Sequence, residues 1–176
     1  MLVLSVAVLT IAGVLAVSLV SKVRSATAFR RFRDGVGDLG IPARLGTTAA
    51  VAAVLGESVT LGLVVVPATA AIGLFAAGSL FAILALVLWR AVARGTAASC
   101  HCFGSTKDTV AARHVARTGA LAVLAYAAGV LDAAAYPSYL SSDPPAAIVA
   151  VAVSGVAVAA VVYLDELMWL FGGSPR

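Results

Sequence analysis

Long apolar runs separated by short charged segments dominate this chain. A helix needs about 20 apolar residues to cross a bilayer. The candidate runs are Leu2–Val20, Thr47–Val66, Ala68–Trp89, Val115–Leu131 and Ala146–Leu170. We therefore predict an all-α integral membrane protein, with a single transmembrane domain over residues 1–176 built as a bundle of about five helices.

The runs differ in how well they fit a membrane span. The third carries no charge and ends at Trp89 and Arg90, an aromatic anchor and a cation at the expected interface. It also offers small residues for close helix approach, at Gly73, Ala77 and Gly78. The fourth run is short for a span, and the last two turns of the fifth should lie outside the hydrocarbon.

Composition supports the membrane assignment and excludes other classes. Hydrophobic residues make up 62% of the chain and charged residues 11%, whereas soluble domains contain roughly 25% charged residues. The formal charge of +4 is not massed on a soluble domain that could bind nucleic acid.

The positions of the cations predict an orientation. No cation of a signal-peptide n-region precedes the first run, so we interpret it as a retained helix. Lys and Arg gather in loops 21–46 and 90–114 and are absent from the turn at Pro67 and from segment 132–145. The positive-inside rule then predicts an outside N-terminus, with both basic loops and the C-terminus in the cytoplasm. The high Ala and Val content fits a GC-rich bacterial source, and hence the bacterial cytoplasmic (inner) membrane.

Segment Ser25–Val36 has the pattern of a short amphipathic helix. Its apolar side chains share one helical face: Phe29, Phe32 and Val36. Its cations lie on the other faces: Arg30, Arg31 and Arg33. This pattern predicts a helix on the membrane surface that touches anionic headgroups, with an ordinary basic loop as the alternative.

Glu57 is a carboxylate near the middle of the second run. A lone carboxylate at that depth costs at least a few kcal/mol, so it should face the bundle interior, be protonated or meet a partner. We expect no Lys or Arg at matching depth on another helix, and therefore no simple ion pair. Glu57 is a candidate functional residue, with hydrogen bonding between helices as the alternative role.

Both cysteines of the chain lie in Cys100-His101-Cys102-Phe103-Gly104. A C-x-C disulfide closes a small, strained ring, and strain makes a disulfide easier to reduce. Three nearby groups, Lys107, Arg113 and His114, can lower the pKa of a thiol and so raise its reactivity. The sequence therefore predicts a redox-active pair on a surface loop. The alternative is two structural thiols that happen to be close.

Several landmarks together resemble the methylamine-utilisation MauE proteins, within the wider DoxX-like group of redox-associated membrane proteins. They are the C-x-C-F-G after the third run, Glu57, and an opening helix that ends in Ser21-Lys22 and leads through Phe29 to Gly40-Ile41-Pro42. The resemblance spans residues 1–131 and implies a four-helix core, with the fifth run as an additional C-terminal helix. It also implies thiol exchange with a thioredoxin-like partner that forms or maintains disulfides of exported proteins. Cys100 and Cys102 are then the redox pair of a candidate thiol–disulfide oxidoreductase, whereas Glu57 and Lys22 have no assigned role.

The expected mechanism is attack of a thiolate on a partner disulfide, followed by release of the mixed disulfide by the second cysteine. A single cysteine pair cannot relay electrons internally, so the partner must be supplied in trans. We expect it to dock over segment 95–108, with Phe103 as an apolar contact and Gly104 allowing close backbone approach. Nothing in the sequence indicates a bound cofactor, and a quinone site has no support in it.

The predicted orientation and the implied role disagree. Exchange with exported proteins needs access from outside, whereas the loop charges place the C-x-C on the cytoplasmic side. Three explanations stay open: the charge rule fails here, the loop is re-entrant, or electrons come from a cytoplasmic thiol pool.

Two other classes of function also stay open. Cys100, His101, Cys102 and His114 could supply soft ligands for copper, zinc or mercury, although the spacing differs from a standard zinc site. A non-catalytic membrane subunit that anchors a larger complex is the other alternative, because fold and motif do not establish activity.

Overall fold

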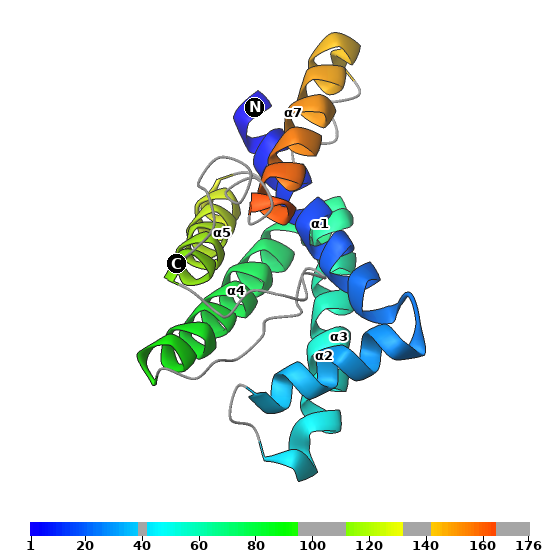
Figure 1. Cartoon of the computed structure of the whole chain (residues 1–176). Coiled ribbons are helices and arrows are strands. Elements are labelled where there is room, and N and C mark those ends of the chain that lie inside the picture. The colour runs from blue at the N-terminus through cyan, green and yellow to red at the C-terminus, as the bar shows by residue number, and fades with distance from the viewer. Residues whose placement is uncertain (39–41, 95–111, 132–141, 165–176) are drawn as a thin grey trace.

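The computed structural model describes the chain outside residues 39–41, 95–111, 132–141 and 165–176 (Figure 1). Its helices are α1 (Leu2–Val23), α2 (Ala26–Asp38), α3 (Ala43–Val65), α4 (Ala70–Ala93), α5 (Ala112–Val130) and α7 (Pro144–Val162), with a 3-10 turn η1 (Pro67–Thr69) before α4. No strand occurs among these described residues. The predicted all-α membrane bundle is therefore confirmed.

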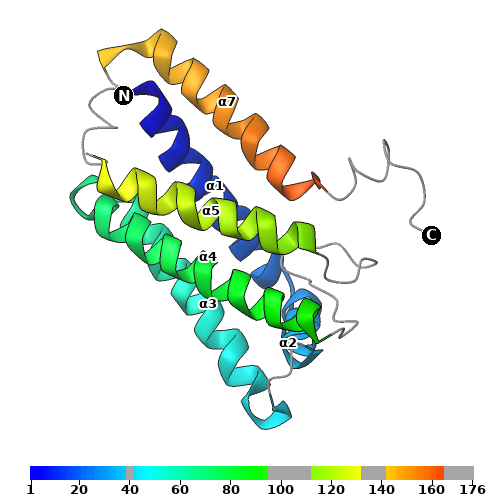
Figure 2. The ribbon, with the colours of Figure 1, turned by 90° about the vertical axis from the view of Figure 1, so that its left-hand side faces the viewer.

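Four helical segments of the described chain are long and apolar enough to cross a membrane, namely α1, α3, η1 with α4, and α7. Helix α5, the fourth predicted span, is not among them, because its first turns carry Arg113, His114 and Arg117. It nevertheless runs antiparallel beside α4 (Figure 2). At 1.5 Å per residue its length is about 28 Å, close to the thickness of the hydrocarbon core. A fifth crossing by α5 stays a prediction.

Helix α1 forms the centre of the bundle and contacts α3, α5 and α7. Its side chains Ile11, Val14 and Leu15 are fully buried. Large apolar side chains on the outside are exposed instead, such as Val3 at 82% and Ile148 at 71%. This arrangement, with apolar groups both inside and outside, suits a bundle surrounded by lipid.

Helices α3 and α4 form a hairpin whose backbones touch at Gly73. A Cβ at this position would lie 2.5 Å from the backbone nitrogen of Val64 and 2.6 Å from the carbonyl carbon of Leu63. The Thr69 hydroxyl donates to the carbonyl oxygen of Leu63 at 2.9 Å, which closes the turn. The predicted role of Gly73 in close helix approach is therefore confirmed.

We expect Gly73→Val to force the hairpin apart, because the obstructing atoms are backbone and cannot rotate away. Overpacking of this kind costs about 1–3 kcal/mol, which a lower melting temperature of the purified protein in detergent would report. The matched control is Gly62→Val on α3, where the residue is exposed and an added Cβ meets nothing within 4 Å. Equal stability of both variants would contradict the close contact at Gly73.

Helix α5 is attached to its neighbours by specific contacts. On the α4 side, the Tyr126 hydroxyl lies 2.9 Å from the Ser79 hydroxyl. A Cβ at Gly78 would lie 3.0 Å from the Tyr126 ring, so the glycine makes room for it. On the α7 side, Arg117 Nη1 donates to the carbonyl oxygen of Val161 at 2.9 Å, which satisfies a carbonyl in the last turn of α7.

The start of the fifth predicted span differs slightly from the sequence prediction of Ala146. Helix α7 starts after Asp143, whose carboxylate accepts a hydrogen bond from the Ala146 amide at 3.1 Å. It ends at Val162, with Tyr163 as its C-cap, whereas the predicted end of the span at Leu170 lies outside the described residues. The predicted last two turns of that span fall mostly on residues outside the described part of the chain.

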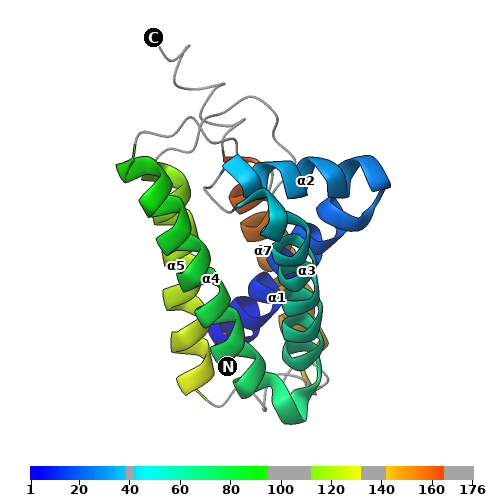
Figure 3. The ribbon, with the colours of Figure 1, turned by 90° about the horizontal axis from the view of Figure 1, so that it is seen from below.

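The predicted amphipathic segment is a helix, α2, and it crosses the bundle at a steep angle to α3 and α4 (Figure 3). Its apolar face packs on protein: Phe32 and Val36 are buried against Ala50 of α3, with Leu84 of α4 alongside. The alternative of an irregular basic loop is wrong for this segment. The expected contact with lipid headgroups is left to the opposite face of the helix.

Candidate functional site

A buried ion pair lies where α1, α2 and α3 meet. Lys22, in the last turn of α1, is 2% exposed, and Glu57 of α3 is 6% exposed. Lys22 Nζ donates to Glu57 Oε1 at 2.7 Å and to Oε2 at 2.9 Å. Glu57 does meet a partner inside the bundle. The expectation that no cation reaches its depth is wrong.

The lysine reaches the carboxylate by pointing back along its own helix. Side chains on a helix lean toward its N-terminus, and Lys22 Nζ donates to the Ser18 hydroxyl at 2.6 Å, one turn earlier. That hydroxyl in turn donates to Glu57 Oε1 at 3.3 Å. Ser18 therefore joins the two charges, and the sequence analysis missed it because a serine near a helix end has no distinctive pattern.

The depth of Glu57 in the bundle differs from its position along its own helix, because α3 is offset from α1. Helix α3 begins well past the end of α1 and extends beyond α2 (Figure 1). From Ala43 to Glu57 the helix rises about 21 Å. A residue in the middle of α3 is therefore level with the last turn of α1.

Phe32 of α2 completes the site. Its ring centroid lies 5.0 Å from Lys22 Nζ, within the range of a cation–π contact. The ammonium thus lies among a carboxylate, a hydroxyl and an aromatic face, from three helices that are separated in sequence. Helix α1 contributes Lys22 and Ser18, α3 contributes Glu57, and α2 contributes Phe32.

The site offers the chemistry of a charge pair. An ammonium has three N–H donors, and here these have acceptors on Glu57 and Ser18. Two opposite charges in an apolar interior stabilise each other, and removal of one partner strands the other. The cluster of Lys22, Glu57, Ser18 and Phe32 contains no thiol or other strong nucleophile, so it can hold helices together or carry a proton.

Most residues of the predicted redox loop lie outside the described residues: Cys100, His101, Cys102, Phe103 and Gly104. Of the two remaining site residues, His114 is buried in the first turns of α5 and Arg113 is partly exposed. The C-x-C falls in sequence between the end of α4 and the start of α5. Both of these helix ends lie at the same end of the bundle as α2 (Figure 2).

The described residues contain no group of three or more His, Cys, Asp or Glu side chains that could hold a metal ion. Three of the four expected soft ligands are in the segment that is not described, and only His114 has a place in the fold. The metal-binding hypothesis therefore rests on the sequence alone.

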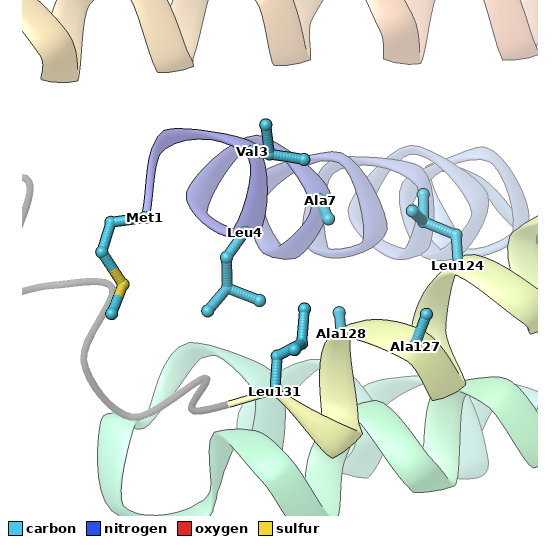
Figure 4. Close-up of a pocket in the computed structure, with 8 residues that line it drawn as sticks. All are labelled: Met1, Val3, Leu4, Ala7, Leu124, Ala127, Ala128 and Leu131. Atoms are coloured by element: carbon cyan, nitrogen blue, oxygen red, sulfur yellow. The ribbon is translucent and has the colours of Figure 1, made fainter.

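An apolar groove of about 360 Å³ lies between the start of α1 and the end of α5 (Figure 4). It is lined by Met1, Val3, Leu4, Ala7, Leu124, Ala127, Ala128 and Leu131. The groove is at the end of α1 opposite Lys22. Its lining side chains are all apolar, so they supply no ionisable or nucleophilic side-chain group.

The sequence model of a family described as methylamine utilisation protein MauE matches residues 1–132. The match includes both members of the ion pair and both cysteines, and it ends before α7. It confirms the resemblance stated from the sequence. No curated protein and no solved structure matches this chain.

Proposed function

Because this chain belongs to the MauE family of membrane proteins, we propose that it is a membrane thiol–disulfide redox protein that works through Cys100 and Cys102. The observation that carries this proposal is that the family match includes the C-x-C segment with both cysteines of the chain. A strained C-x-C disulfide suits exchange better than structural bracing. The proposed role agrees with the redox association that the family resemblance implies.

In the proposed reaction, one thiolate of the pair attacks a disulfide of the partner. The partner disulfide breaks, a mixed disulfide forms, and one partner sulfur leaves as a thiolate. The second thiolate of the pair then attacks the mixed disulfide. The products are the C-x-C disulfide and a partner dithiol, so two electrons pass to the partner and its two sulfurs take up two protons. The reverse direction oxidises the partner.

The proposed partner is a thioredoxin-like protein, because a chain with two cysteines holds only one electron pair. It docks over segment 95–108, with Phe103 as an apolar contact and Gly104 allowing close approach. His101, Arg113 and His114 supply positive charge or hydrogen bonds that favour the thiolate. A larger membrane complex is compatible with this role.

In this proposal Lys22 and Glu57 are positioning residues. They bind α1 to α3 and, through Phe32, to α2. This junction lies at the end of the bundle where α4 ends and α5 begins (Figure 2). A rigid junction would keep the end of α4 and the start of α5 in fixed positions, so that the redox loop between them is held ready for the partner. By the positive-inside rule, the cations of this end support a cytoplasmic location for it, with the N-terminus outside.

Alkylation of the thiols tests the redox proposal. Cells are exposed to an oxidant and quenched with acid, and a maleimide of high mass is added with or without mild reduction. We expect both thiols to be protected before reduction and both to react after it, which would shift the protein on a gel by two adducts. Full reaction of both cysteines under oxidising conditions, with no protected form, would refute a reversible disulfide.

The side of access is measured with a membrane-impermeant maleimide. After reduction, it should label inverted membrane vesicles and leave intact cells unlabelled. Labelling from outside would show that the C-x-C is reached from outside, through a reversed orientation or a re-entrant loop. It would remove the conflict with exported substrates, while the redox proposal would stand.

A further inference from the structure

The polar face of α2 points away from the protein. Its apolar face is sealed by the cluster of Phe32, Val36 and Ala50, with Phe29 at the edge. On a helix, Arg30 and Arg31 project from the side opposite these residues, and both are exposed. Arg24, just before the helix, is exposed as well. The outer face of α2 therefore presents cations that the fold does not use.

The pairing of these arginines separates them from Arg33. Arg33 Nη2 lies 2.8 Å from Asp34 Oδ1, so its charge has a partner on the same helix. Within the described part of the chain, no ion pair or hydrogen bond involves the side chains of Arg24, Arg30 or Arg31. Their charge is free to meet an outside anion.

The depth of α2 indicates which anion is near. Helix α2 packs against Leu84 of α4, and Trp89 lies further along α4 by about 8 Å. Trp89 is 57% exposed, and Arg90 follows it, as expected for residues at the membrane interface. An interfacial amphipathic helix lies about 5–10 Å inside the headgroup boundary. The level at which α2 crosses the bundle matches this depth.

We propose that the outer face of α2 binds the phosphate groups of anionic phospholipids through Arg30 and Arg31, with Arg24 at its edge. The guanidinium fork matches phosphate oxygens in a bidentate geometry. Arginine side chains extend toward the headgroups while their stems stay on apolar surface. This binding site is independent of the proposed redox function.

Spin-labelled lipids measure the binding directly. The full chain is reconstituted in phosphatidylcholine vesicles that contain a trace of spin-labelled phosphatidylglycerol or spin-labelled phosphatidylcholine. The motionally restricted fraction of each label gives their relative association with the protein. We expect phosphatidylglycerol to be preferred by about fivefold, the effect of one well-placed arginine near an anionic surface. About 1 M salt, which screens charges beyond about 3 Å, should weaken the preference and leave only the direct guanidinium–phosphate contacts.

Two double variants with equal loss of charge locate the site. Arg30→Gln with Arg31→Gln should bring the preference close to one, whereas Arg44→Gln with Arg94→Gln should leave most of it. Arg44 and Arg94 are exposed at the start of α3 and at the end of α4, outside α2. No preference in the unaltered protein, no loss in the α2 variant, or equal loss in both variants would overturn the proposal. In the first case an acidic protein would become the better candidate for this face.

Discussion

Replacing Glu57 by leucine should destabilise the protein more than any single change outside the ion pair that we describe. The variant leaves the Lys22 ammonium buried next to Ser18 and Phe32 without its carboxylate. Breaking a buried pair in this way costs about 3–5 kcal/mol. A fall of about 10 °C in the melting temperature of the purified protein in detergent would correspond to it. Lys22→Met should have a similar effect, because it strands the carboxylate instead.

The double variant Lys22→Met with Glu57→Leu distinguishes pairing from either charge alone. Both buried charges are then gone, so most of the lost stability should return. Ser58→Leu is a control at the neighbouring position, because Ser58 is exposed and its hydroxyl donates to the carbonyl oxygen of Val54 on its own helix. A double variant as unstable as the single variants would contradict a simple pair. If the double variant folds but no longer exchanges thiols, the ion pair also positions the redox loop. Glu57→Gln, in a protein that still folds, should then lose thiol exchange as well.

Replacing one cysteine of the C-x-C should stop thiol exchange completely and leave a trapped intermediate. Without the resolving thiol, the mixed disulfide with the partner cannot be released. We expect a species of higher mass on non-reducing gels from Cys100→Ser or from Cys102→Ser, and its collapse on reduction. Both variants are needed, because the sequence does not indicate which thiol attacks first.

The variant with both cysteines replaced is the control and should trap nothing. Mass spectrometry of the trapped species should identify a thioredoxin-like protein. If neither single variant traps a partner while the protein is abundant, the thiol-exchange proposal fails. Thiol titration with and without copper or zinc would then test the metal-binding alternative, and a silent titration would favour a scaffold role.

The sequence was sufficient for the helices and insufficient for the site between them. Long apolar runs form helices in a bilayer because a helix satisfies all of its backbone hydrogen bonds within one segment, and such runs can be counted along the chain. The apolar face of α2 was also predictable, because Phe29, Phe32 and Val36 recur with the helical period. Small residues such as Gly73 marked a close approach, although the partner backbone at Val64 could not be named.

The ion pair was not predictable by counting, because the vertical offset of one helix against another is a property of packing. Lys22 was taken as a loop cation and Glu57 as a lone intramembrane acid, whereas the offset of α3 brings them together. The contact of Phe32 with Lys22 has the same origin. A periodic pattern shows which face of a helix is apolar, and not which cation that face will cover.

The order of Lys22 and Glu57 along the chain also bears on how the protein enters the membrane. Helices inserted during synthesis arrive from the N-terminus, so α1 with Lys22 is in place before α3. Helix α3 carries Glu57 and is the least apolar of the four candidate spans, which makes it the one with the weakest tendency to insert alone. Lys22 at the end of α1 is then available to pair with the Glu57 carboxylate when α3 enters the membrane. The order of the helices therefore supplies a charge partner before the helix that needs it is made.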